Sequence, residues 1–113
     1  MPENLEKTLN GFFTSRFSRE ERLRKKSQIF RAMCDDRNVA DSVAEIVIKF
    51  LGSARHCLQE FEDIELVDLL FFLSSSRGVN FSSRINRGVE TVMNWPEWEK
   101  LPNSYQGVKI YTS

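Results

Sequence analysis

The strongest constraint on the fold is a helical apolar period in the middle of the chain. Apolar side chains recur there at the spacing of about three to four residues that places them on one face of an α-helix. This stripe consists of Val43, Ile46, Val47, Phe50, Leu51, Ala54, Leu58 and Phe61. We therefore expect a long amphipathic helix, with Asp41 well placed to cap its first turn.

The segments before this stripe also carry helical patterns. The spacing of apolar residues predicts a first helix over residues 3–15. Ser18 stands three residues before Glu21, which is the pattern of a capping box, so a second helix should run from there to Asp35. The apolar stripe of that second helix is thin and comprises Leu23, Ile29, Phe30 and Met33.

The segments after the stripe predict two more helices. Residues from Ile64 to Leu73 are apolar on nearly every side, which predicts the central and most buried helix. Gly78 can end it in the left-handed conformation. A fifth helix should start at Asn80 or Ser82 and stop at Trp95-Pro96, with one further helical turn over 96–101.

Together these patterns predict an all-α fold. The chain has 113 residues, which suits one domain with a single core. We expect a small irregular or orthogonal bundle of four to five helices over residues 1–102. Residues 103–113 should form a short extended C-terminal tail, in which 107–111 alternates like a strand.

The zero net charge conceals two poles of opposite sign. A separation of this kind indicates a molecule that meets something charged, for instance a second copy of itself. The basic segment 16–31 holds Arg16, Arg19, Arg22, Arg24, Lys25, Lys26 and Arg31, and the acidic pole holds Glu60, Glu62, Asp63, Glu65 and Asp68.

Motifs that would indicate an enzyme are missing. The sequence has no HExxH, GxSxG or CxxC pattern and no glycine-rich phosphate loop. His56 and Cys57 are adjacent, so on a helix they point about 100° apart and cannot form a nucleophilic pair locally. The acidic pole lacks the glycine that a calcium loop needs at its sixth position. We expect no catalytic residue, no metal site and no cofactor.

Two segments could contact nucleic acid instead. Side chains of the basic segment could follow phosphates. Residues 66–93 could form a helix-turn-helix-like hairpin that offers Arg84, Asn86 and Arg87 to a groove, although Ile85 falls one residue later than the usual spacing. The structural alternative for the basic segment is a solvated helix face whose cations pair with the acidic pole. The structural alternative for residues 66–93 is an ordinary antiparallel helical hairpin.

The sequence therefore favours a non-enzymatic interaction module, either a protein-binding adaptor or an assembly or regulatory subunit, with nucleic-acid binding as the alternative. The expected partner is another protein or a second copy of the chain, and we expect no contact with a membrane. Residues 1–4 show neither a basic nor an apolar leader region, so we expect an intracellular, cytoplasmic protein. Cys34 and Cys57 should then be buried, reduced thiols.

Overall fold

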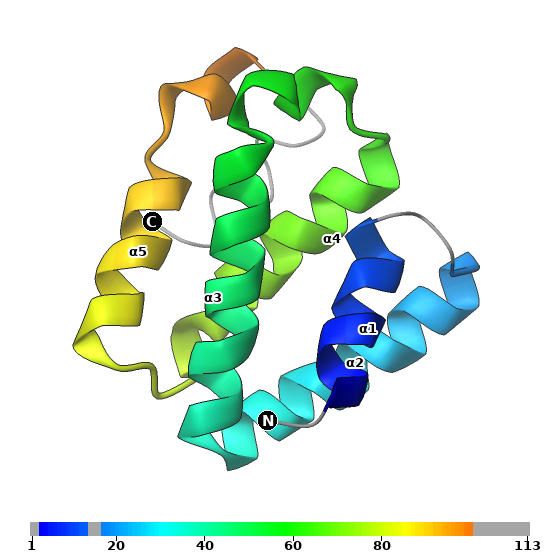
Figure 1. The fold of residues 1–113 in the computed structure, drawn as a ribbon, viewed down its shortest axis with the longest axis vertical. Helices are drawn as coiled ribbons and strands as arrows, with labels where there is room; N and C mark the ends of the chain where they lie inside the picture. Colours follow the sequence, from blue (N-terminus) through cyan, green and yellow to red (C-terminus); the bar gives the residue numbers. More distant parts are fainter. Residues whose placement is uncertain (1–2, 14–16, 101–113) are drawn as a thin grey trace.

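A computed structural model describes residues 3–13 and 17–100, which form an irregular all-α bundle (Figure 1). The expected all-α class is confirmed, and the expected tail at 103–113 lies outside the described residues. The α-helices are α1 (Glu3–Phe13), α2 (Arg19–Asp35), α3 (Arg37–Ser53), α4 (Asp63–Ser74) and α5 (Ser83–Met93). Short 3₁₀ turns are η1 (Arg55–Glu60), η2 (Ser75–Gly78) and η3 (Pro96–Lys100).

Helix α4 is the most buried helix, as expected, with eight of its 12 residues buried against five of 17 in α3, but the helix in the centre of the bundle is α3. Helix α3 packs against α1, α2, α4, α5 and η1, and it runs through the middle of the molecule in Figure 1. Its stripe residues Val43, Val47 and Leu51 are fully buried. A helix with one continuous apolar stripe and small Ala40 and Ala44 beside it can accept neighbours on several sides, whereas α4 keeps part of its apolar surface exposed.

Local capping determines where the first helices begin. The Ser18 hydroxyl accepts the backbone N–H of Glu21 at 3.3 Å, which confirms Ser18 as the N-cap of α2. Helix α3 starts earlier than expected, because Asp36 rather than Asp41 caps it by accepting the N–H of Asn38. Asp41 instead accepts the backbone N–H of Ser82 at 3.0 Å and ties α3 to the start of α5.

Two expected helix ends are also different in the structure. The stripe that begins in α3 does not continue as one helix, since α3 stops at Ser53 and η1 carries Leu58 into the core. Gly78 does not adopt the left-handed conformation, because α4 passes into the 3₁₀ turn η2 instead of ending on a glycine cap. The expected start of α5 is confirmed at Ser82, whose hydroxyl accepts the N–H of Ile85.

The core contains aromatic side chains from distant segments. Phe12 on α1 meets Phe72 on α4 edge to face, with ring centroids 5.3 Å apart. Phe13 stacks on Phe50 of α3 at 4.1 Å. These contacts join α1 to both α3 and α4, so Phe12 and Phe13 hold the bundle together.

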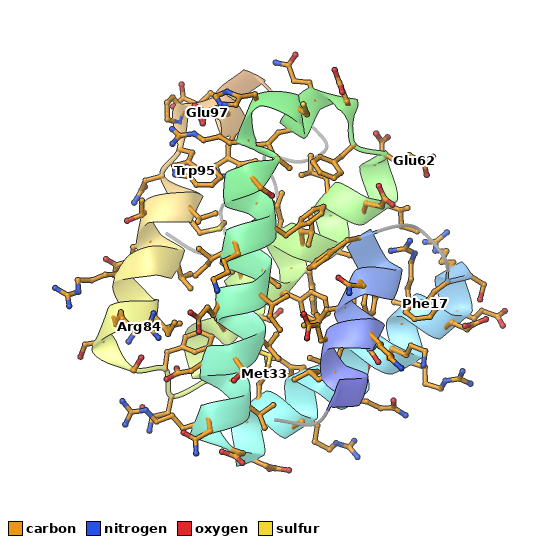
Figure 2. The ribbon with its side chains drawn as sticks, in the orientation of Figure 1. Phe17, Met33, Glu62, Arg84, Trp95 and Glu97 are labelled. Carbon is orange, nitrogen blue, oxygen red and sulfur yellow. The ribbon has the colours of Figure 1, made fainter. Side chains whose placement is uncertain are left out.

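The end of the described chain is held against η1. Arg55 forms an ion pair with Glu97 and its guanidinium lies 4.5 Å from the centre of the Trp95 ring. The indole N–H of Trp98 donates to the carbonyl of Val92. Figure 2 shows Trp95 and Glu97 on the same side of the bundle, next to the end of α3. The helical turn expected from Pro96 is therefore confirmed, and it is anchored by both tryptophans.

Candidate interaction surface between α2 and α4

A groove separates α2 from α4, and we call it the α2/α4 groove. The two helices run in the same direction, because Arg22 pairs with Asp68 while Lys26 lies over the ring of Phe71 further along. Long side chains rather than close backbones join them. The groove is lined by Arg19, Arg22, Leu23 and Lys26 from α2 and by Asp63, Ile64, Val67 and Asp68 from α4.

Exposed apolar side chains gather at this groove. Within the described residues, the large apolar side chains left exposed are Leu23 at 54%, Ile64 at 37% and Phe71 at 40%. Ile64, Val67 and Phe71 share one face of α4, since they are spaced by three and four residues. Leu23 lines the groove from α2 together with Ile64 and Val67 of α4, and Phe71 continues the same face of α4 beneath the amino group of Lys26. An apolar strip of this kind, rimmed by charge, is typical of a protein-interaction site.

The sequence pattern assigns Leu23 to the apolar stripe of α2 and Ile64 to the most buried helix, but both side chains are exposed. Helix α4 is apolar around its whole circumference, so its pattern does not say which side lacks a neighbour. A signal was nevertheless present for Leu23, because it stands among charged residues from Arg19 to Lys26 without an apolar residue one turn away. Such an isolated apolar residue on a charged helix is a better candidate for a contact surface than for a core.

A buried ionic network lies under the groove. Asp68, which is 5% exposed, accepts Arg22 Nη1 at 3.2 Å and Lys26 Nζ at 3.0 Å. Arg22 Nη1 also donates to the carbonyl of Phe12 at 3.2 Å, while Nη2 is buried without a hydrogen-bond partner among the described residues. The two charge poles therefore meet inside one molecule, and three of their charges serve to join α1, α2 and α4.

Glu65 is a second buried member of the acidic pole. Burial raises the pKa of its carboxyl above the ordinary value, and repulsion from Glu62 raises this pKa further. Attraction to Arg22 lowers the pKa of Glu65 and so opposes both effects. Glu65 thus acts on the stability of the bundle rather than as an accessible contact residue.

Of the other basic residues in this segment, one packs against an aromatic ring and three are exposed to solvent. Lys25 lies 5.0 Å from the centre of the Phe17 ring, which holds it against the start of α2. Arg19, Arg24 and Arg31 are exposed and form no ion pair within residues 3–13 and 17–100. Arg16 lies outside the described residues. The exposed positive charge of α2 is therefore smaller than the sequence indicated.

The remaining acidic residues are at the opposite wall. Glu60, Glu62 and Asp63 are exposed at the end of η1 and the start of α4. Figure 2 shows Glu62 at the outer end of α4, on the same side of the molecule as Phe17 before α2. The groove is consequently bordered by positive charge along α2 and by negative charge at the first turn of α4.

The hairpin expected over residues 66–93 does not have helix-turn-helix geometry. Such motifs join their helices by a turn of about three to four residues, but here residues 75–82 separate α4 from α5. Helix α5 also packs mainly on α3. Arg84, Asn86 and Arg87 are exposed; Arg84 approaches Glu45 at 3.8 Å and Asn86 donates to the carbonyl of Phe81.

The remaining points concern isolated residues and features of the described chain as a whole. Cys34 and Cys57 are free thiols, but both are exposed, so their expected burial is wrong. His56 is also exposed. Across the described part of the chain, no group of three or more acidic, histidine or cysteine side chains could hold a metal ion. In the same part, no helix has the length and apolar character to span a membrane.

Comparison with known protein families, with curated proteins and with solved structures finds no match for this chain.

Proposed function

We propose that this chain is a non-enzymatic protein-interaction module, acting as an adaptor or as an assembly or regulatory subunit, and that the α2/α4 groove is its contact surface. The observation that carries this proposal is the gathering of Leu23, Ile64 and Phe71 in one place, while the other large apolar side chains of the described residues are buried or half-buried. The proposed location is the cytoplasm, where exposed free thiols such as Cys34 and Cys57 stay reduced.

The arrangement matches the anatomy of protein interfaces. Their centres are apolar and depleted of charge, while their rims are polar and accessible. Complete burial of a leucine, isoleucine or phenylalanine side chain is worth about 1.5–3 kcal/mol. Covering the exposed parts of Leu23, Ile64 and Phe71 supplies part of that energy, and the charged rim provides orientation.

Site-specific photocrosslinking in cells tests this proposal. A photoreactive residue replaces Leu23 in the groove, and in a matched chain it replaces Thr91, which is exposed on α5. We expect protein adducts from position 23 that are absent from position 91, whether the adduct is another protein or a second copy. Equal or absent protein adducts at both positions would refute the role of the groove.

Nucleic-acid binding is the second candidate function. It is favoured by Arg24 and Arg31, which are exposed on one face of α2 and unpaired within the described residues. They stand two helical turns apart, or about 10.5 Å along the axis. We therefore expect any such binding to be driven by phosphate contacts rather than by base readout.

Titration of labelled duplex and single strands at about 50 mM salt separates the two functions. If α2 contacts phosphates, the double variant Arg24→Glu, Arg31→Glu should bind more weakly, with a flatter salt dependence. If α5 reads bases, Arg84→Ala or Arg87→Ala should instead relax sequence preference. No binding at tens of micromolar protein would remove the nucleic-acid function and leave protein binding as the proposal.

A further inference from the structure

We propose, building on the function proposed above, that the α2/α4 groove receives a second copy of this chain, in a dimer whose two-fold axis runs along the groove. Three observations lead to this partner. The groove has an apolar centre, its two walls carry opposite exposed charges, and the helices that form those walls run in the same direction.

The charges of the two walls are distributed so that one wall complements the other. On the α2 wall, Arg19 is exposed and has no ion-pair partner among the described residues. On the α4 wall, Asp63 is exposed and lines the same end of the groove, next to exposed Glu62. Each wall therefore presents the sign of charge that the other wall would attract.

Symmetry determines how two such grooves can meet. A two-fold interface brings the same patch of both copies together, so it must be self-complementary. An axis along the groove places α2 of each copy over α4 of the other, which sets Arg19 opposite Asp63 on both sides of the axis. An axis across the groove would instead place α2 on α2 and bring like charges together, which is unfavourable.

The parallel direction of α2 and α4 strengthens this argument. Rotation about an axis along the groove keeps the starts of all four helices at one end. Arg19 at the start of α2 then meets the acidic first turn of α4 in the second copy. Leu23, Ile64 and Phe71 of both copies cover one another in the centre, where they exclude water from the contact.

The apolar strip is small, which sets the expected strength of the dimer. Stable interfaces bury about 800 Å² on each partner. The apolar strip alone is smaller than this, so an interface of that size must also include the charged residues on both sides of the strip. We therefore expect a dimer that depends on protein concentration and weakens as salt rises, because salt screens exposed charges.

Exchange of charges between two variants provides the decisive experiment. Arg19→Glu would set two acidic walls together in its own dimer, and Asp63→Lys would set two basic walls together. Both residues are exposed, so neither substitution places a charge in the core. Circular dichroism and thermal melting check that both variants fold. When the two variants are mixed in equal amounts, one contact of the mixed dimer pairs the introduced glutamate with the introduced lysine. The other contact keeps the original pair of Arg19 and Asp63.

Sedimentation equilibrium of the purified full chain gives the dissociation constants. We expect each single variant to raise the dissociation constant by at least about tenfold, and the equimolar mixture to return to within about threefold of wild type. Leu23→Glu should also raise it by at least about tenfold, because it places a charge in the apolar centre. Arg87→Glu on α5 is the matched control and should leave dimerisation unchanged.

The possible results separate this inference from the proposed function. A wild-type chain that stays monomeric at millimolar concentration overturns the dimer, and so does a dimer whose charge variants are not restored by mixing. If the chain is monomeric but position 23 still crosslinks to a different protein in cells, the proposed function stands and the second copy is ruled out. Absence of protein adducts at position 23 refutes both.

Discussion

Arg22 on α2 and Asp68 on α4 lie 46 positions apart in the sequence and form a buried ion pair at 3.2 Å. Their side chains are 3% and 7% exposed. The pair joins the basic segment to the acidic pole inside the molecule. Removing one partner leaves an uncompensated buried charge, whereas removing both does not.

We accordingly expect Asp68→Ala to lower the free energy of unfolding by about 3–5 kcal/mol. The triple variant Arg22→Met, Lys26→Met, Asp68→Leu should recover most of this loss, since none of the three charges of the network remains. Urea unfolding, monitored by circular dichroism, measures the free energy of unfolding of each variant. Glu45→Ala is the matched control, because Glu45 pairs with Lys49 and Arg84 at 3.8 Å near the surface, and it should cost less than about 1 kcal/mol. Equal losses at Asp68 and Glu45 would show that the network is not buried.

The neighbouring residues Leu70 and Phe71 should respond differently to truncation. Leu70 is 1% exposed, so Leu70→Ala should cost about 2–5 kcal/mol through cavity formation. Phe71 is 40% exposed, so Phe71→Ala should cost less than about 1 kcal/mol. Thermal and urea unfolding of the two variants decides this. A larger loss at Phe71 than at Leu70 would reverse the assigned orientation of α4.

Replacing a helical glycine by alanine should destabilise the chain at Gly11 and stabilise it at Gly52. A Cβ at Gly11 would overlap the ring of Phe17, which is held by Phe12 and Lys25. We expect Gly11→Ala to destabilise the chain by about 1–3 kcal/mol through overpacking. A Cβ at Gly52 meets nothing within 4 Å, so Gly52→Ala should stabilise by about 0.5–1 kcal/mol through helix propensity. Melting temperatures of the two variants test the contrast, and stabilisation by Gly11→Ala would mean that Phe17 does not pack on α1.

The raised pKa of Glu65 predicts a pH dependence of stability. Below pH 4.5, the ordinary pKa of a glutamate, Glu65 is protonated in both the folded and the unfolded chain. The neutral carboxyl is the form that the buried position favours, so the contribution of Glu65 to stability is at its maximum there. As the pH rises above that value, the unfolded chain releases its proton first, so this group lowers the free energy of unfolding until the folded pKa is passed. The stability of the wild type relative to Glu65→Gln should therefore fall in this window.

Melting curves of wild type and Glu65→Gln from about pH 4 to pH 8 measure this difference. Glu60→Gln, which changes an exposed carboxylate in the same way, controls for the loss of one negative charge. If the difference between wild type and Glu65→Gln stays constant over the whole range, Glu65 does not titrate differently in the folded chain.

Local sequence patterns predicted the features that depend on neighbouring residues. The cap at Ser18, the start of α5 at Ser82 and the turn after Pro96 are confirmed because each is formed by residues within one helical turn. The burial of Val43 and Val47 follows from a stripe that any partner would have to cover. Local patterns were therefore enough to predict the all-α class and most helix positions.

Which side of each helix has a neighbour depends instead on how the helices pack together. Nothing local distinguishes Phe71, which is exposed, from Phe72, which is buried against Phe12. Nothing local shows that Asp41 bonds to Ser82, or that Arg22 is buried while Arg24 is exposed. These outcomes depend on contacts between segments far apart in the chain, so the apolar strip of the α2/α4 groove emerged only when α2 and α4 were placed beside each other.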